Sequence, residues 1–164
     1  MSGAPPQYES TDHVIHCDYR STGLAHKLSN LCGYEFVLDG IRCGSIEGFL
    51  QSLKFRDDAD AHSVRRLNGT KCFFAGQKGN GWKVGQVLWW NGVGYQRSSK
   101  EYAMLLERAY NACFDQNEVF SDALFMSRHY ELRHDFGKTD MMDSVLTRTE
   151  YLYNLYRLRS RFQR

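Results

Sequence analysis

The segment GSIEGFLQSLKF, residues 44–55, has the spacing of an amphipathic helix that packs on a hydrophobic core. Its apolar side chains fall at positions i, i+3, i+4 and i+7, and they belong to Ile46, Phe49, Leu50 and Leu53. Ser45 suits the N-terminus of this helix, because a serine hydroxyl accepts a hydrogen bond from a free amide of the first turn. The segment therefore predicts a core helix whose other face carries Glu47, Gln51 and Lys54.

The residues on either side of this helix contain further short elements. The run EFVLDGIRC predicts two short strands, because Asp39-Gly40 in its middle is a strong signal of a β-hairpin. Residues 13–19 have another short β-type pattern, and residues 21–33 are expected to form a polar connection. Residues 59–67 predict a second, shorter helix.

The second half of the chain predicts longer helices. Ser98 and Glu101 form a capping-box pair ahead of a long apolar stripe. Another helix is expected from Glu118 onward. Thr147 and Glu150 form a second capping-box pair, which predicts a final helix near the C-terminus.

Two stretches lack helical periodicity. Residues 76–94 are rich in glycine and hold all three tryptophans, which predicts an irregular loop with aromatic anchors. Residues 128–146 are rich in His, Asp and Lys. The whole pattern predicts one α+β domain, predominantly helical with a few short N-terminal strands, over residues 13–164. A flexible tail is expected at residues 1–12.

Composition argues against several classes of protein. The chain of 164 residues is 42% hydrophobic, which suits one core, and its formal net charge of +2 gives no general attraction to nucleic acid or membranes. No apolar run approaches the ~20 residues of a membrane-spanning helix. Five cysteines without a C-x-x-C pair favour reduced thiols and a cytoplasmic location. The spacing of the six histidines does not match a metal site, so no metal is expected.

The glycine-rich stretch carries no nucleotide-binding fingerprint. Residues 76–83 lack the G-x-x-x-x-G-K-[ST] order of a P-loop. Free backbone amides beside Lys78 and Lys83 can still cradle a phosphate, and a flexible surface loop is the alternative interpretation.

Four short motifs lie in the first third of the chain. They are Leu28-Ser29-Asn30, Phe36-x-x-Asp39-Gly40, Gly44-Ser45-Ile46-Glu47 and Phe49-x-Gln51-x-x-Lys54-Phe55. In order and spacing they resemble the opening of the NADAR family, also called the YbiA-like superfamily, and a looser resemblance extends over residues 14–162. It implies a YbiA-like domain with N-glycosidase activity, which hydrolyses the bond between a ribose and a base or amine. The implied substrates are ADP-ribose attached to guanine in nucleic acid, or ribosylamino-pyrimidine intermediates of riboflavin metabolism.

The chain departs from the family pattern in places. Gly48 stands where the family has a histidine, which implies a lost ligand contact and a wider site beside Glu47. The segment HDFG at residues 134–137 is the nearest match to the family's D-x-x-W-G, with Phe136 in place of the tryptophan. Trp89 or Trp90 is expected to stand where the family has its central tryptophan. These departures leave the identity of the substrate open.

The resemblance also implies roles for individual residues. Cleavage of an N-glycosidic bond develops positive charge on the ribose, and a carboxylate at Glu47 can stabilise this charge and activate the attacking water. Asp135 or Asp140 is then the second acid group, and Trp89 or Trp90 stacks on the base. The other residues expected to bind substrate are Ser29, Asn30, Gly44, Ser45, Gln51, Lys54, Lys78 and His134. No metal or organic cofactor is required.

Three functions fit these residues. The first is an N-glycosyl hydrolase acting on an ADP-ribosyl or related ribosyl nucleotide, with DNA or RNA as a partner if the modified base lies in nucleic acid. The second is a non-catalytic binder, or sponge, of an ADP-ribose-like or other nucleotide signal, which suits a phage counter-defence protein. The third is an interaction protein that contacts a partner through its aromatic surface. The first is the predicted function, because Glu47, Gln51 and Lys54 are retained. The missing histidine and tryptophan of the family pattern favour the second, which is the alternative. The sequence does not predict the oligomeric state.

Overall fold

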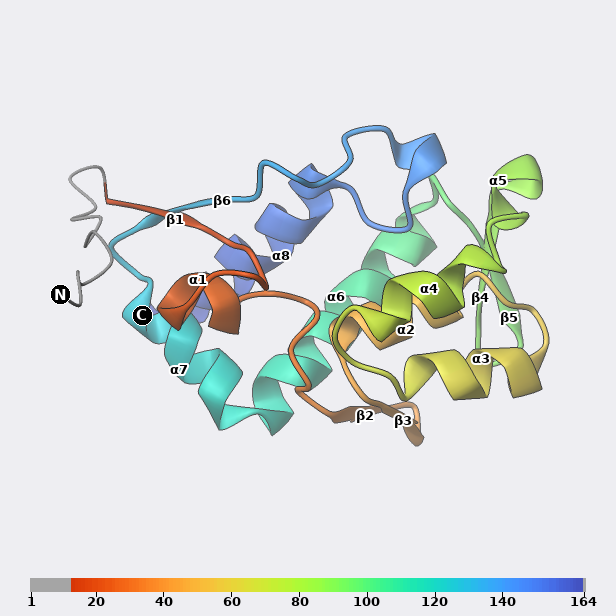
Figure 1. The fold of residues 1–164 in the computed structure, drawn as a ribbon, viewed down its shortest axis with the longest axis horizontal. Helices are drawn as coiled ribbons and strands as arrows, with labels where there is room; N and C mark the ends of the chain where they lie inside the picture. The colour runs from red at the N-terminus through yellow and green to blue at the C-terminus, as the bar shows by residue number, and fades with distance from the viewer. Residues whose placement is uncertain (1–12, 164) are drawn as a thin grey trace, which may run out of the picture.

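The computed structural model describes residues 13–163, so the tail expected at residues 1–12 lies outside the described residues. The long helix α6 (Lys100–Gln116) crosses the middle of the molecule (Figure 1). The other α-helices are α1 (Gly23–Lys27), α2 (Ile46–Ser52), α3 (Asp58–Arg65), α4 (Lys71–Gln77), α5 (Trp82–Gly85), α7 (Glu118–Met126) and α8 (Arg148–Arg159). Short 3-10 helices are η1 (Met141–Asp143) and η2 (Ser160–Phe162).

The strands of the described residues form separate two-stranded pairs rather than one sheet. Two pairs are antiparallel hairpins, β2 (Phe36–Leu38) with β3 (Ile41–Cys43) and β4 (Val87–Trp90) with β5 (Val93–Gln96). The third pair is parallel and joins β1 (Val14–His16) to β6 (Glu131–Arg133). The core is therefore built mainly from helices, with the strands at its edges.

The helix predicted from residues 44–55 is confirmed as α2. Its apolar side chains are buried, and the ring of Phe49 meets that of Trp90 edge-on, with centroids 5.1 Å apart. Ser45 caps the helix as expected, because its Oγ accepts a hydrogen bond from the Gly48 amide at 2.9 Å. The apolar side chains of this segment thus pack into the core, as their spacing predicts.

The later helices are also confirmed, with one change of cap. The capping box of α8 is present, since the Thr147 hydroxyl accepts from the Glu150 amide and the Glu150 carboxylate accepts from the Thr147 amide. The cap of α6 is Ser99 rather than the expected Ser98, and its Oγ accepts from the Tyr102 amide at 3.1 Å. The helix consequently begins one residue later than the capping-box prediction.

Residues 71–96 are more ordered than predicted. The expected irregular loop contains α5 and the β4–β5 hairpin, α4 precedes it, and α1 likewise lies in the expected polar connection. The turn residues Asn91 and Gly92 have φ values of 50° and 79°, close to the 52° and 77° of Asp39 and Gly40. Positive φ at both central residues is what a tight two-residue hairpin turn requires, and Asn-Gly supplies it. The glycine-rich composition concealed this signal.

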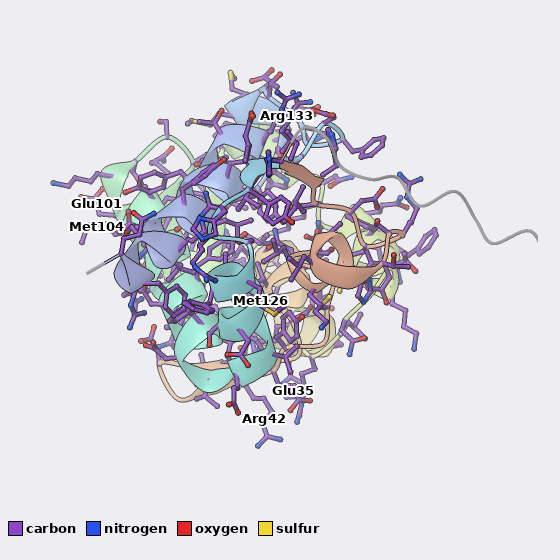
Figure 2. The ribbon with its side chains drawn as sticks, turned by 90° about the vertical axis from the view of Figure 1, so that its left-hand side faces the viewer. Glu35, Arg42, Glu101, Met104, Met126 and Arg133 are labelled. Carbon is purple, nitrogen blue, oxygen red and sulfur yellow. The ribbon has the colours of Figure 1, made fainter. Side chains whose placement is uncertain are left out.

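The parallel pair of β1 and β6 joins two segments that lie more than a hundred residues apart in the sequence. Ile15 lies opposite Leu132, and the Leu132 amide donates to the Tyr156 hydroxyl of α8 at 2.8 Å. Figure 2 views this end of the molecule, with Arg133 of β6 projecting outward. After β6 the chain runs along the upper edge of Figure 1 toward α8. This path places residues 134–147 opposite α2.

The predicted α+β fold is confirmed, with helices predominating and a few short strands. Within residues 13–163, no helix has the length and apolar character needed to cross a membrane. All five cysteines are buried and unpaired. Burial raises the pKa of thiols such as Cys43, to about 12, so these side chains act as small core residues.

Candidate functional site

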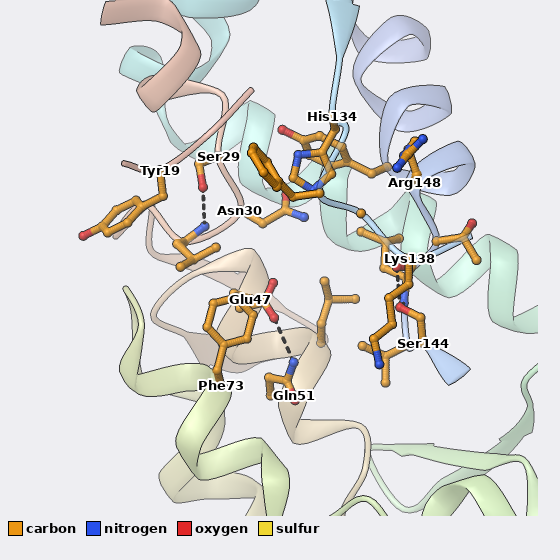
Figure 3. Close-up of a pocket in the computed structure, with 18 of the residues that line it drawn as sticks. Tyr19, Ser29, Asn30, Glu47, Gln51, Phe73, His134, Lys138, Ser144 and Arg148 are labelled. Carbon is orange, nitrogen blue, oxygen red and sulfur yellow. Dashed lines mark hydrogen bonds between the residues drawn. The ribbon is translucent and has the colours of Figure 1, made fainter. Parts of the chain in front are cut away.

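A cavity of about 590 Å³ lies between α2, α4 and the segment from His134 to Tyr151 (Figure 3). This volume falls within the roughly 300–1,000 Å³ of typical small-ligand sites. Residues 17–20, which follow β1, and His134 with residues 136–138, which follow β6, both contribute to the lining. The β1–β6 pair therefore assembles one wall of the cavity from two distant parts of the sequence.

Glu47 faces the cavity from the first turn of α2, and only 8% of the residue is exposed. Gln51, one turn along the helix, donates a hydrogen bond from Nε2 to Glu47 Oε1 at 2.8 Å. Burial raises the pKa of Glu47, whereas the Gln51 hydrogen bond and the positive charge of Lys54 act to lower it. A carboxylate whose pKa is raised accepts a proton more readily, as a general base requires.

Lys54 lines the cavity at the end of the same helix face. Its Nζ donates a hydrogen bond to Asn80 Oδ1 at 2.8 Å. Burial lowers the pKa of Lys54 to about 8, the charge of Glu47 acts against this, and the cations Lys83 and Lys138 lower it further. One face of α2 thus presents an acid with a raised pKa and an amine with a lowered one.

The opposite side of α2 packs against the end of α3. A Cβ on Gly48 would lie 2.6 Å from the Leu67 carbonyl oxygen and 2.8 Å from that of Arg65. The Gly44 amide donates to the Arg65 carbonyl at 2.8 Å, and Ser45 Oγ donates to the Leu67 carbonyl, also at 2.8 Å. The expectation that Gly48 widens the site is therefore wrong, because this residue permits close backbone packing outside the cavity. Gly44 and Ser45 likewise hold the helix in place and do not line the cavity.

Asn30 and Ser29 reach the cavity from the loop before the first hairpin. The Asn30 carbonyl accepts a hydrogen bond from the Glu47 amide at 3.0 Å, which ties this loop to the start of α2. The Tyr110 hydroxyl donates to Asn30 Oδ1 at 2.8 Å, so the amide nitrogen of Asn30 is left to face the cavity (Figure 3). Ser29 Oγ accepts from the Leu31 amide at 3.2 Å and keeps its own proton to donate.

His134 lies above Asn30 in Figure 3, at the far wall of the cavity. Its Nδ1 is 2.9 Å from the Cys17 carbonyl oxygen. Because a carbonyl only accepts hydrogen bonds, Nδ1 carries the proton and Nε2 of the neutral ring is an acceptor. The ring packs edge-on against Tyr151, with centroids 4.8 Å apart, so its orientation is fixed from two sides.

Positive charge dominates the polar part of the lining, which includes the side chains of Arg20, Lys54, Lys83, Lys138 and Arg148. Asp143 also lines the cavity, and its carboxylate accepts hydrogen bonds from Lys83 at 2.6 Å and from Lys138 at 3.1 Å. Asp18 pairs with Arg20 at 3.2 Å. These hydrogen bonds lower the pKa of both carboxyls, so neither is a proton donor near neutral pH.

Several residues expected in the site lie elsewhere. Asp135 pairs with His16 at the surface, with 3.2 Å between Oδ2 and Nδ1. Asp140 caps η1, because its Oδ1 accepts from the Met142 amide at 2.9 Å. Lys78 is exposed at the C-terminal end of α4 and does not line the cavity. The structure therefore gives neither aspartate a place beside Glu47.

The tryptophan that lines the cavity is Trp82, and neither Trp89 nor Trp90 does so. Both belong to strand β4, whose side chains alternate between two faces. Trp90 is buried in the core and donates from Nε1 to Asp39 Oδ2 at 2.8 Å, while Trp89 lies under the Arg56 guanidinium at 4.7 Å. Trp82 is buried, and its Nε1 has no hydrogen-bond partner within the described residues. The turn signal Asn91-Gly92 predicts a hairpin and so places Trp89 and Trp90 on a strand, which argued against a loop position for them at the site.

Further lining residues were not among those expected in the site, although Phe136 belongs to the HDFG segment that matches a family motif. Phe73 is 44% exposed at the cavity, which leaves its ring free to stack on a planar ligand. Phe136 is 71% exposed, and the Arg20 guanidinium lies over its ring at 5.0 Å. Nε of Arg148 is buried without a hydrogen-bond partner in the described part of the chain. Unpartnered buried donors are rare in folded proteins, and beside a cavity they mark positions where a ligand oxygen can bind.

Comparison with known proteins identifies relatives of this chain. Residues 23–160 match the family model described as Bacteriophage protein GP30.3. A 17.1 kDa protein of the Gp30–rIII intergenic region of Enterobacteria phage T4 is 35% identical over 136 residues, covering 80% of this chain and 88% of that protein. The NMR structure of Escherichia coli YbiA matches with a TM-score of 0.59 and 17% identity, covering 98% of this chain and 94% of YbiA. The predicted YbiA-like fold is confirmed, and by the match over most of its length the chain belongs to the bacteriophage GP30.3 family.

Proposed function

We propose that this protein is an N-glycosidase-like hydrolase that cleaves a ribose–nitrogen bond. Its substrate is an ADP-ribosyl group on a base such as guanine, or a ribosylamino-pyrimidine. The observation that carries the proposal is the buried Glu47, with its raised pKa, in a cavity surrounded by cationic and aromatic side chains. A phosphorylated ribosyl ligand needs positive charge for its phosphates, an aromatic surface for its base and a carboxylate beside its ribose.

In the proposed reaction the oxygen of a water molecule bonds to the ribose C1′ while the C1′–N bond breaks. Glu47 accepts a proton from this water, and its negative charge stabilises the oxocarbenium-like transition state. The electron pair of the broken bond leaves with the nitrogen, and Lys54 supplies a proton to it. A lysine whose pKa is about 8 can give up a proton near neutral pH, which an ordinary lysine does poorly.

The remaining lining residues are assigned to binding. Lys83, Lys138 and Arg148 bind the phosphates, which displace the carboxylate of Asp143 from the two lysines. The exposed ring of Phe73 stacks on the base, a contact worth ~1–3 kcal/mol per base in single-stranded nucleic-acid sites. The amide nitrogen of Asn30 donates to a ribose hydroxyl. If the base belongs to DNA or RNA, Phe136 offers a further ring to a flanking nucleotide.

A non-catalytic binder, or sponge, is the second candidate, and one observation favours it. Among residues 13–163, the other carboxylates that line the cavity are Asp18 and Asp143, and cations hold both ionised, so this part of the chain supplies no second carboxylic acid to assist Glu47. The same cations and rings would still retain a nucleotide ligand. The two candidates differ only in whether the bound ligand is broken.

The test is incubation of the full chain with four compounds, followed by mass spectrometry. They are ADP-ribosylated guanine in DNA, NAD, free ADP-ribose and the ribosylamino-pyrimidine. Glu47→Gln keeps the size and hydrogen bonds of the side chain but removes its charge, and Glu118→Gln removes an exposed charge from the first turn of α7 as the matched control. Turnover that disappears in Glu47→Gln and persists in Glu118→Gln supports the hydrolase. Recovery of intact, tightly bound ligand supports the sponge. If the protein shows no turnover and no binding, both functions are contradicted.

A further inference from the structure

A second hollow, of about 230 Å³, lies between the β2–β3 hairpin and helix α3. It is separate from the cavity, because none of its lining residues is shared with that site. In Figure 1 the hairpin and α3 lie in the lower part of the molecule, whereas the segment that covers the cavity follows the upper edge. The residues that line the hollow are Gly40, Ile41, Arg42, His62, Arg65 and Arg66.

Three arginines and a histidine therefore meet in one small hollow, from two separate parts of the chain. Arg65 lies in the last turn of α3 and Arg66 is its C-cap, where positive charge is favoured by the helix dipole. That explanation does not cover Arg42, which comes from the opposite wall on β3 and projects outward in Figure 2. Within residues 13–163, Arg42 and Arg66 make no ion pair, so their charges are not balanced by a carboxylate of the described chain.

The charge of Arg65 is only weakly balanced. Its side chain is 10% exposed, and both guanidinium contacts to Asp58 Oδ1 are long, at 3.3 Å. The side chain of Asp58 is 86% exposed, so water screens this pair strongly. A buried guanidinium requires more hydrogen-bond acceptors than this to offset the cost of its desolvation.

His62 adds a second shortage of acceptors. Its Nδ1 is 3.4 Å from Arg65 Nη2, and its Nε2 is 3.3 Å from Arg66 Nη1. A neutral imidazole has one acceptor nitrogen and a protonated one has none, while guanidinium nitrogens only donate. At least one of these two contacts therefore brings two donors together, and an oxyanion between the side chains would supply the missing acceptors.

Two backbone carbonyl groups at and just after the end of α3 already accept hydrogen bonds from the residues that precede α2. The Arg65 carbonyl accepts from the Gly44 amide, and the Leu67 carbonyl accepts from Ser45 Oγ. These two acceptors are therefore used by Gly44 and Ser45, while the arginine side chains that line the hollow supply donors.

We propose that the hollow between the β2–β3 hairpin and α3 is a second binding site, for a phosphoryl group held by Arg42, His62, Arg65 and Arg66. Guanidinium groups bind phosphate through paired N–H donors, and convergence of three of them matches its oxygens. The phosphoryl group comes either from a small phosphate compound or from a nucleic-acid backbone. This site does not depend on the activity proposed for the cavity.

The test is a nuclear magnetic resonance titration of the uniformly ¹⁵N-labelled full chain with sodium pyrophosphate and, separately, with a six-nucleotide thymidine oligomer. We expect saturable shifts of the amides of Gly40, Arg42, His62 and Arg66. Arg42→Gln/Arg66→Gln removes two exposed cations of the hollow and should weaken this binding at least tenfold. Lys27→Gln/Lys100→Gln removes two exposed cations elsewhere, makes the same change in net charge and should leave the binding unchanged.

Each outcome decides the proposal. Shifts with pyrophosphate identify a small phosphate compound as the source, and shifts with the oligomer alone identify a nucleic-acid backbone. Shifts confined to residues of the cavity, such as Glu47 and Lys138, would overturn the proposal. Equal weakening by both double variants would also overturn it, because it would reveal attraction to net charge rather than a site.

Discussion

The two sides of helix α2 show how one short segment serves two purposes. On one side, Gly48 lies so close to the end of α3 that a single added carbon would meet two backbone carbonyl oxygens. On the other side, Glu47, the adjacent residue, holds a carboxylate at a cavity where burial raises its pKa. The first side is closely packed, and on the second side burial disfavours the ionised form of Glu47. Adjacent residues of one helix can therefore respond to substitution in opposite ways.

The largest expected effect is on the cavity side, in Glu47→Gln. If Glu47 is the general base, we expect turnover to fall about 10³-fold, within the range typical of a lost acid–base group. The raised pKa means that the ionised carboxylate is less favourable in the folded than in the unfolded chain, so it lowers stability at neutral pH. A neutral glutamine removes this cost, so the unfolding temperature should stay the same or rise. Loss of turnover accompanied by unfolding would contradict the assignment, and calorimetry distinguishes the two.

Gly48→Ala is the matched change on the packed side of α2. It is expected to lower the stability of the protein, whereas Glu47→Gln lowers turnover and leaves stability unchanged or higher. The new Cβ would lie 2.6 Å from the Leu67 carbonyl oxygen, and backbone cannot move aside as a flexible side chain does. We expect the free energy of unfolding to fall by about 3 kcal/mol, the upper end of typical overpacking costs. Gly85→Ala in α5 is the control, because a Cβ there meets no atom within 4 Å and should not destabilise the chain. Equal denaturation midpoints for the two variants would show that α2 and α3 are not tightly packed.

The dependence of turnover on pH tests the two ionisable groups that face the cavity from α2 and the residues just after it, Glu47 and Lys54. Glu47 must be ionised, so the rate should fall as the pH drops below its raised pKa, at a higher pH than an ordinary glutamate would give. Lys54 must be protonated, so the rate should fall as the pH rises above about 8. Each limb should approach a slope of about tenfold per pH unit. In Lys54→Arg the alkaline limb should disappear and the maximal rate should drop, because guanidinium does not release its proton. An alkaline limb that stays near pH 8 in this variant would exclude Lys54.

The smallest expected effect is on ligand affinity, and it distinguishes Trp82, which lines the cavity, from Trp89, which does not. Trp82→Phe keeps an aromatic side chain but replaces the indole by a smaller ring without the unpartnered Nε1–H, so we expect ligand affinity to fall about fivefold, as for one neutral hydrogen bond. Trp89→Phe, on β4 under Arg56, should not change affinity. Isothermal titration of the Glu47→Gln background with ADP-ribose measures both without turnover. An affinity loss in Trp89→Phe alone would place the ligand elsewhere.

Local patterns were sufficient for the elements whose stability is local. The apolar spacing of residues 44–55 and the cap at Ser45 specify α2, and Thr147 with Glu150 specifies the start of α8. Asp39-Gly40 specifies a hairpin because few residues adopt positive φ at both turn positions. Asn91-Gly92 carries the same information, but the glycines around it led to the prediction of an irregular loop instead of a hairpin.

The sequence by itself determined the YbiA-like motifs, the helix that carries Glu47, and the residue types on which the proposed function depends. Only the tertiary structure decided which of them meet. Glu47, Gln51, Lys54 and His134 face one cavity, whereas Asp135 and Asp140 turn to the surface and Trp90 enters the core. The physical reason is that helical spacing fixes neighbours within α2, while the opposite wall depends on the pairing of β1 with β6, which are more than a hundred residues apart. No local pattern encodes such a pairing.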